Sequence, residues 1–95
     1  MSTYIILRRL PPAALDDPRH SLELADQVSR KIKDECPNVR WKESYATLGR
    51  YDVVDVVETE DPKEIDKVTT IIQAYGHSTT DTLIGTPWKQ FLAGL

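Results

Sequence analysis

Short apolar or alternating runs, typical of strands, take turns along the chain with segments whose apolar residues recur every three or four positions, as in helices. The pattern therefore predicts strands and helices in succession. The uninterrupted run Tyr4-Ile5-Ile6-Leu7 predicts a first strand that is buried on both faces and therefore lies inside its sheet. Two prolines follow at positions 11 and 12, and proline has no amide hydrogen to donate to a neighbouring strand. We therefore expect the strand to end there and a loop to cover residues 11–17.

Two segments repeat their apolar residues every three or four positions, as amphipathic helices do. The first helix is expected to run to about residue 35. Asp17 can cap its amino end, with Pro18 at the first helical position, and Ser21 is the alternative cap. The second is expected to begin at Pro62, after the capping residue Asp61. Its apolar stripe consists of Ile65, Val68, Ile71, Ile72 and Tyr75.

The ends of the second helix carry two further signals. Glu64 is placed to reach back toward Asp61, as in a capping box. Gly76 stands where a helix commonly ends in a left-handed residue, which glycine adopts at little cost.

The segment between the two helices predicts a β-hairpin. Residues 39–48 and 51–58 are rich in aromatic and β-branched residues, which favour strands. The two strands meet at Gly49, which can adopt the positive φ that a tight turn requires. Alternation along the first of them places Val39, Trp41 and Tyr45 on one face.

The end of the chain predicts a fourth strand and a last short helix. Residues 77–84 are rich in threonine, which favours a strand. A helix is expected to start at Thr86-Pro87, with one apolar side made of Trp88, Phe91, Leu92 and Leu95.

The order strand, helix, strand, strand, helix, strand predicts an α+β fold, the ferredoxin-like βαββαβ plait. Its four-stranded antiparallel sheet carries both helices on one face. We expect residues 1–95 to form one domain, with residues 84–95 as a C-terminal extension. The face without helices is expected to pack against a second copy as a dimeric α/β barrel, in a homodimer or a higher even oligomer.

The same alternation predicts which faces the side chains of the third strand occupy. If Val54 and Val56 face the helices, then Val53 and Val57 lie on the open face of the sheet. Asp55 would then point into the space between the two sheets of a dimer.

Composition narrows the function classes. The chain is 40% hydrophobic and 28% charged, as globular proteins are, and its net charge of −3 argues against binding to nucleic acid. A single cysteine excludes an intrachain disulfide, and no Cys or His pair has metal-ligand spacing, so we expect no metal and no cofactor. Neither a secretory leader nor an apolar run long enough for a membrane span is recognisable, so a cytoplasmic protein without membrane contact is expected.

The chain resembles the GYD domain family, and the resemblance covers about residues 3 to 84. The matching residues are Tyr4, Leu7, Tyr45, Thr47-Leu48-Gly49, Tyr51-Asp52, Glu58, Asp61, Gly76, Thr80 and Thr82-Leu83. The resemblance implies a ferredoxin-like fold of the dimeric α/β-barrel kind. It implies no activity, because the family is largely uncharacterised, so no catalytic residue can be assigned.

Three segments depart from the family. Asp55 stands where the family usually has a small apolar residue, and the loop before the first helix differs from the family's polar turn. The tail from Trp88 to Leu95 lies outside the family's pattern. The chain is more weakly similar to the effector-binding domain of leucine-responsive regulators.

Asp55 is the residue with the clearest chemical implication, since it interrupts a run of four valines. A buried carboxylate must be paired, hydrogen-bonded or protonated. The turn at Gly49 places Ser44 opposite Asp55, and Arg8 and His77 are the candidate charged partners. Three interpretations remain open: an ion pair at a subunit interface, a general acid/base or ligand anchor in a barrel cavity, and simple exposure to solvent.

The other candidate ligand-binding residues are aromatic. Tyr45, Tyr51 and Trp88 could line a cavity, although a tryptophan in the position of Trp88 more often forms a packing lid or a subunit contact. Asp52, just after the turn, is expected to accept hydrogen bonds from backbone amides.

Together these features favour an oligomeric module that binds a small molecule. One alternative is a cofactor-independent enzyme of the dimeric-barrel type, an isomerase or oxygenase acting on a small metabolite, in which Asp55 does the proton transfer. The other is an effector-sensing domain like that of the leucine-responsive regulators. Whether the chain is an enzyme is left open by the sequence.

Overall fold

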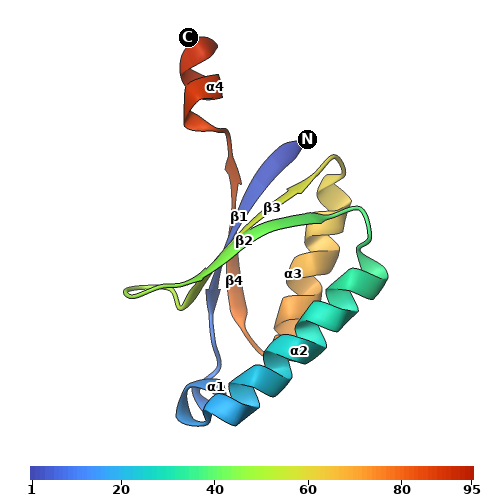
Figure 1. The fold of residues 1–95 in the computed structure, drawn as a ribbon, viewed down its shortest axis with the longest axis vertical. Helices are drawn as coiled ribbons and strands as arrows, with labels where there is room; N and C mark the ends of the chain where they lie inside the picture. The colour runs from blue at the N-terminus through green and yellow to red at the C-terminus, as the bar shows by residue number, and fades with distance from the viewer.

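The computed structural model describes the backbone of residues 1–95 and every side chain except that of Leu15. The chain folds into four strands and four helices (Figure 1). In order they are β1 (Ser2–Arg9), α1 (Pro12–Asp16), α2 (Pro18–Glu35), β2 (Arg40–Ala46), β3 (Val53–Thr59), α3 (Pro62–Gly76), β4 (Thr79–Gly85) and α4 (Trp88–Ala93). The predicted elements are all present. The expected loop over residues 11–17 is wrong in one respect, because most of it forms the short helix α1.

The strands form one antiparallel sheet in the order β2-β3-β1-β4. The long helices α2 and α3 lie together on one face of it (Figure 1). The ferredoxin-like plait predicted from the element order is therefore confirmed. The predicted central position of β1 is confirmed, because it pairs with β3 on one side and β4 on the other. The predicted burial of both its faces is wrong for the single subunit, since Tyr4 and Ile6 are buried but Ile5 and Leu7 are partly exposed.

The predicted starts of both long helices are confirmed by their capping hydrogen bonds. The Asp17 side chain accepts a hydrogen bond from the amide of Arg19 at 3.0 Å. The Asp61 side chain accepts one from the amide of Lys63, also at 3.0 Å. The capping box expected at α3 is wrong, because the Asp61 amide donates to the hydroxyl of Thr59 at 3.2 Å instead.

The end of α3 differs from the sequence-based expectation by one residue. Gly76 is the last helical residue, and His77, with φ of 54°, takes the left-handed position. Gly76 is buried, and a Cβ there would lie 3.1 Å from Cγ2 of Val28 on α2. The glycine therefore permits the close approach of α2 and α3, while the turn falls to the next residue.

The face assignment of β3 predicted from the sequence is wrong by one position. Ile6 of β1 faces the helices with 0% exposure, and it pairs with Asp55. Residues that are paired across neighbouring strands share a face of the sheet, so Asp55 points toward α2 and α3 as Ile6 does. Val53 and Val57, two positions away along β3, point the same way. Val54 and Val56 lie on the open face. A shift of one residue reverses every side chain of a strand, and the valines on both sides of Asp55 gave no pattern to fix it.

The predicted faces of β2 are wrong for a different reason. The pairing with β3 shifts between Trp41 and Glu43, which is a β-bulge. Trp41 and Ser44 consequently lie on the helix side together, whereas Tyr45 lies on the open face. Strict alternation cannot reveal such a bulge.

The hydrophobic core fills the space between the sheet and the two long helices. Val39, just before β2, packs against it and is partly buried. The core residues are Tyr4, Ile6, Val28, Ile32, Cys36, Val57, Ile65, Val68, Ile71 and Ile72.

Helix α4 projects from the end of β4, away from α2 and α3 (Figure 1). Its apolar side chains stay exposed, with 69% of Trp88 accessible to solvent. The rings of Trp88 and Phe91 stack on each other with centroids 5.7 Å apart. Trp88 is therefore a surface residue, and it lines neither of the two hollows described below.

Candidate functional site

A buried ion pair lies at the centre of the helix side of the sheet. The Asp55 side chain is fully buried, and the side chain of Arg8 on the adjacent strand is 17% exposed. Nη2 of Arg8 donates to Oδ1 of Asp55 at 3.0 Å, and Nε lies 2.7 Å from Oδ2. Both carboxylate oxygens thus lie close to one guanidinium group, Oδ1 through a hydrogen bond and Oδ2 through an ionic contact without hydrogen-bond alignment.

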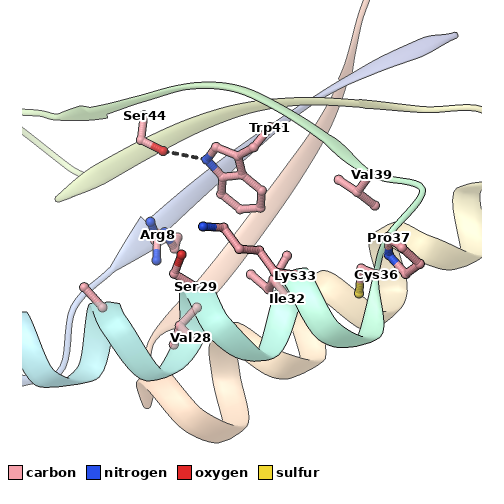
Figure 2. A pocket seen from close by; sticks show the side chains of 11 residues that line it. Arg8, Val28, Ser29, Ile32, Lys33, Cys36, Pro37, Val39, Trp41 and Ser44 are labelled. Carbon is pink, nitrogen blue, oxygen red and sulfur yellow. Dashed lines mark hydrogen bonds between the residues drawn. The ribbon is translucent and has the colours of Figure 1, made fainter.

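The hairpin strand β2 adds two groups to this pair. Ser44 lies opposite Asp55, and its hydroxyl donates to Oδ1 at 2.6 Å. The indole Nε1 of Trp41 in turn donates to the Ser44 hydroxyl at 2.7 Å (Figure 2). A continuous chain of hydrogen bonds therefore joins a partly exposed indole to a buried carboxylate.

Arg8 and Ser44 were predicted from the sequence to be neighbours of Asp55, and the structure places both beside it. His77 is exposed at the end of α3, and no hydrogen bond or ion pair joins it to Asp55 among the described side chains. Because Asp55 faces the helices of its own chain, its ion pair is internal to the subunit. The interpretations of Asp55 as a subunit-interface ion pair and as a barrel-cavity residue are both wrong in this respect.

A cleft of about 430 Å³ opens beside this network, between α2 and β2 (Figure 2). Its walls combine apolar and cationic side chains. The residues that line it are Arg8, Ala25, Val28, Ser29, Ile32, Lys33, Cys36, Pro37, Val39, Trp41 and Ser44.

A second hollow of about 570 Å³ lies toward the start of α2. It includes Leu10, Leu22 and Val53, and its lining is largely apolar. Arg8 lines both hollows. Ser21 closes one side, with its hydroxyl donating to the carbonyl of Ala14 on α1.

The turn between β2 and β3 is tied to the end of β1 through Asp52. The Asp52 side chain accepts a hydrogen bond from the amide of Leu10 at 2.8 Å, and its own amide donates to the carbonyl of Arg8 at 2.8 Å. Gly49 has φ of +117°, which confirms the need for glycine in this turn. The backbone-acceptor role expected for Asp52 is confirmed.

Two of the aromatic candidates lie away from the cleft. The Tyr51 hydroxyl donates to Oδ2 of Asp81 at 3.0 Å, and the Arg9 guanidinium lies 5.8 Å from the Tyr51 ring centroid. Tyr45 is on the open face, where its hydroxyl donates to Glu43. The structure therefore separates the predicted site residues: Arg8 and Asp55 lie together, whereas Tyr45, Tyr51, His77 and Trp88 lie elsewhere.

Several cleft residues escaped the sequence-based prediction. Trp41 was expected on the same face as Tyr45 and on the face opposite to Ser44, and the bulge in β2 instead brings Trp41 and Ser44 to the same side. Ser29 and Lys33 stand one helical turn apart beside the apolar stripe of α2, and this spacing was the signal that could have placed them together.

The open face of the sheet carries two adjacent cross-strand rows of apolar side chains. In the first, Ile5 lies between Leu83 and Val56; in the second, Leu7 and Val54 are paired and Tyr45 follows. Leu83 is 47% exposed and Tyr45 52%. Neither α2 nor α3 covers this face (Figure 1).

Cys36, at the end of α2, lines the cleft, and its thiol is expected to be protonated and unreactive. Burial raises the pKa of its thiol, and the negative charge of Glu64 raises it further. The neutral thiol is a poor nucleophile and metal ligand. Among the described residues there is no cluster of three or more potential metal ligands, and no helix is long and apolar enough to cross a membrane.

A ferredoxin-like plait whose hairpin turn, at Gly49, is tied to β1 by Asp52 defines the class of this chain. The model of the GYD domain matches residues 4–94, and the chain belongs to this family. The match includes the whole of α4, so the expectation that the tail lies outside the family's pattern is wrong.

A curated relative and two solved structures are similar along almost their whole length. The relative is a protein of Thermus thermophilus named glutamine synthetase and cystathionine beta-lyase binding protein, with 30% identity over 100% of this chain and 99% of its own length. The structure of TTHA0845 from Thermus thermophilus has a TM-score of 0.61, at 27% identity over 92% of this chain and 95% of that one. The hypothetical protein PHS023 from Pyrococcus horikoshii has a TM-score of 0.56, at 28% identity over 92% of each chain.

Proposed function

We propose that this protein is a homo-oligomeric binding module in which two copies pack their open sheet faces together as a dimeric α/β barrel. The observation that carries the proposal is the pair of apolar rows on that face, which contains Ile5, Leu7, Val54 and Val56. Contiguous apolar surface of this kind costs free energy in water and typically marks an interaction site.

The polar rim of the same face supports contact between identical copies. It carries both signs of charge: Arg9 and Arg40 are positive, and Glu43, Glu58 and Asp81 are negative. In a two-fold interface each residue can meet a different residue of the other copy, so a mixed rim allows opposite charges to pair. A rim of one sign would instead repel its own copy.

The partner of the assembled module is proposed to be another protein, in the cytoplasm. The support is the name of the Thermus relative, which describes binding to two enzymes. The exposed apolar side of α4 offers further surface for such a contact. A small molecule is proposed as a second ligand, because the cleft beside Arg8 has the volume and lining of a ligand site.

The alternative that the protein is a cofactor-independent enzyme of the dimeric-barrel type loses its main support. It required Asp55 to present a free carboxylate inside the barrel, but both of its oxygens contact Arg8 on the helix side. Substitution of Asp55 is therefore expected to act on stability rather than on proton transfer. The sensing alternative predicts a ligand pocket at a subunit boundary, whereas the cleft is lined by α2, β1 and β2 of one subunit.

The test is the mass of the native assembly, measured by native mass spectrometry and sedimentation, for the wild type and for Val56→Glu. Val56 lies within the apolar rows beside Glu43, so a second carboxylate there would be desolvated and repelled in a dimer. We expect an even-numbered wild-type oligomer and a monomeric variant.

The matched control is Leu22→Glu, which places the same charge on an exposed leucine of α2. It should leave the assembly unchanged. A monomeric wild type at micromolar concentration, or dissociation by both variants alike, would contradict the proposed interface.

A further inference from the structure

The cleft between α2 and β2 has two chemically different ends. At one end lie Arg8, Ser29 and Lys33, and Figure 2 shows the Lys33 ammonium group pointing toward the Arg8 end, below the ring of Trp41. The other end is apolar and is formed by Ile32, Cys36, Pro37 and Val39. A ligand that fills the cleft must therefore combine a polar head with an apolar body.

The charge of the polar end selects the head group. Arg8 and Lys33 are cations, and the described lining side chains include no carboxylate. Asp55, which is fully buried, accepts a hydrogen bond from Nη2 of Arg8 and lies in ion-pair contact with its Nε. The two N–H groups on Nη1 of Arg8 have no hydrogen-bond partner among the described residues, so they remain available to an acceptor, as does the ammonium group of Lys33.

The position of Arg8 is fixed before any ligand arrives. Its two contacts with Asp55 hold the guanidinium plane, and Ser44 and Trp41 hold the carboxylate in turn. An anion-binding group that is already oriented loses little conformational entropy on binding. The buried carboxylate thus positions the cation that faces the cleft.

We propose that this cleft binds a small organic carboxylate whose apolar body packs between Trp41 and α2. The carboxylate contacts Arg8 and Lys33, and the body extends toward Val39. The cleft volume of about 430 Å³ lies inside the range of roughly 300–1,000 Å³ that is usual for small-molecule sites. This inference rests on the binding-module function but not on its dimeric assembly, because the cleft opens on the helix side.

Two matched probes test the head group: 4-phenylbutyrate and its neutral amide, 4-phenylbutyramide. They are titrated into the full chain while backbone amide and indole resonances are followed by NMR. We expect the carboxylate to shift the resonances of Ser29, Lys33, Val39 and the Trp41 indole, and to bind at least tenfold more tightly than the amide. Its affinity should fall as salt is added, because the cations are partly exposed.

Matched variants test the cation. Lys33→Gln should weaken 4-phenylbutyrate binding by roughly three- to tenfold, the effect of losing one partly solvated charged hydrogen bond. Lys63→Gln makes the same change on α3, outside the cleft lining, and should leave the affinity unchanged. Equal binding of both probes, equal effects of both variants, shifts confined to the open face, or no shifts at all would each overturn the inference.

The outcome is separable from that of the assembly test. Carboxylate binding by the Val56→Glu monomer would support the cleft whatever the wild-type mass is. An even-numbered wild-type oligomer that fails to bind 4-phenylbutyrate would overturn the cleft inference alone.

Discussion

Asp55 is a buried charge that its neighbours Arg8 and Ser44 make tolerable. A carboxylate removed from water is stable only if its partners replace the lost solvation, and Arg8 and Ser44 do so with contacts of 2.6 to 3.0 Å. The two members of the pair are unequal, because Arg8 retains some contact with solvent and Asp55 has none. Their removal should therefore have unequal effects.

We expect Arg8→Met to lower the free energy of unfolding by about 3–5 kcal/mol, because it leaves Asp55 buried without its cation. Asp55→Leu should cost less, since the unpaired guanidinium can turn toward solvent. The double variant Arg8→Met/Asp55→Leu should recover most of the loss. Urea unfolding of the four proteins measures the cycle, and additive single effects would show that the two residues are not coupled.

The thiol of Cys36 should make stability fall at alkaline pH. Burial, and then the charge of Glu64, hold its pKa above the usual value in the folded protein. The unfolded thiol has a pKa of about 8.5, so well below that pH both states are protonated and stability is unaffected. Above it the unfolded state ionises first, and stability declines until the folded thiol ionises too.

This decline is measured as the free energy of unfolding in urea at several pH values from 7 to 10, for the wild type and for Cys36→Ala. The difference between the two proteins should shrink as pH rises. A difference that stays constant would show that the folded and unfolded thiols have the same pKa.

At the scale of elements, the sequence predicted strands and helices better than it predicted their faces. Helix starts were recoverable because Asp17-Pro18 and Asp61-Pro62 are local signals, read within one turn. The faces of β2 and β3 depend on partners distant in sequence. A run of valines on both sides of Asp55, and a bulge after Trp41, leave register to be decided by packing.

Helix α4 is the element with the least support from its own chain. Its apolar side chains are exposed, and it projects away from α2 and α3 (Figure 1). We therefore expect a chain that ends at Pro87 to retain the stability of the full chain within about 0.5 kcal/mol, when both carry Val56→Glu. Thermal and urea unfolding check this. A loss of more than about 1 kcal/mol would mean that α4 packs on the body of the subunit.

At the scale of the whole molecule, the two sides of the sheet are suited to different tasks. The open face is apolar and broad, as a surface for a second copy would be, while the helix side holds the ion pair and the cleft. Of the candidate site, the pairing of Asp55 with Arg8 and Ser44 was predictable from strand order. The cleft was not, because it depends on how α2 packs over β2, and Lys33 and Trp41 are 8 residues apart with no shared local pattern.

The inequality within the Arg8–Asp55 pair also constrains how such a pair can arise during evolution. A chain that gained arginine first could direct the new cation toward water through the same opening that now leaves it 17% exposed. A chain that gained the fully buried carboxylate first would have to fold around an uncompensated charge. The cation is therefore the residue that could come first. The thermodynamic cycle between the two positions measures the change in the free energy of unfolding at each substitution.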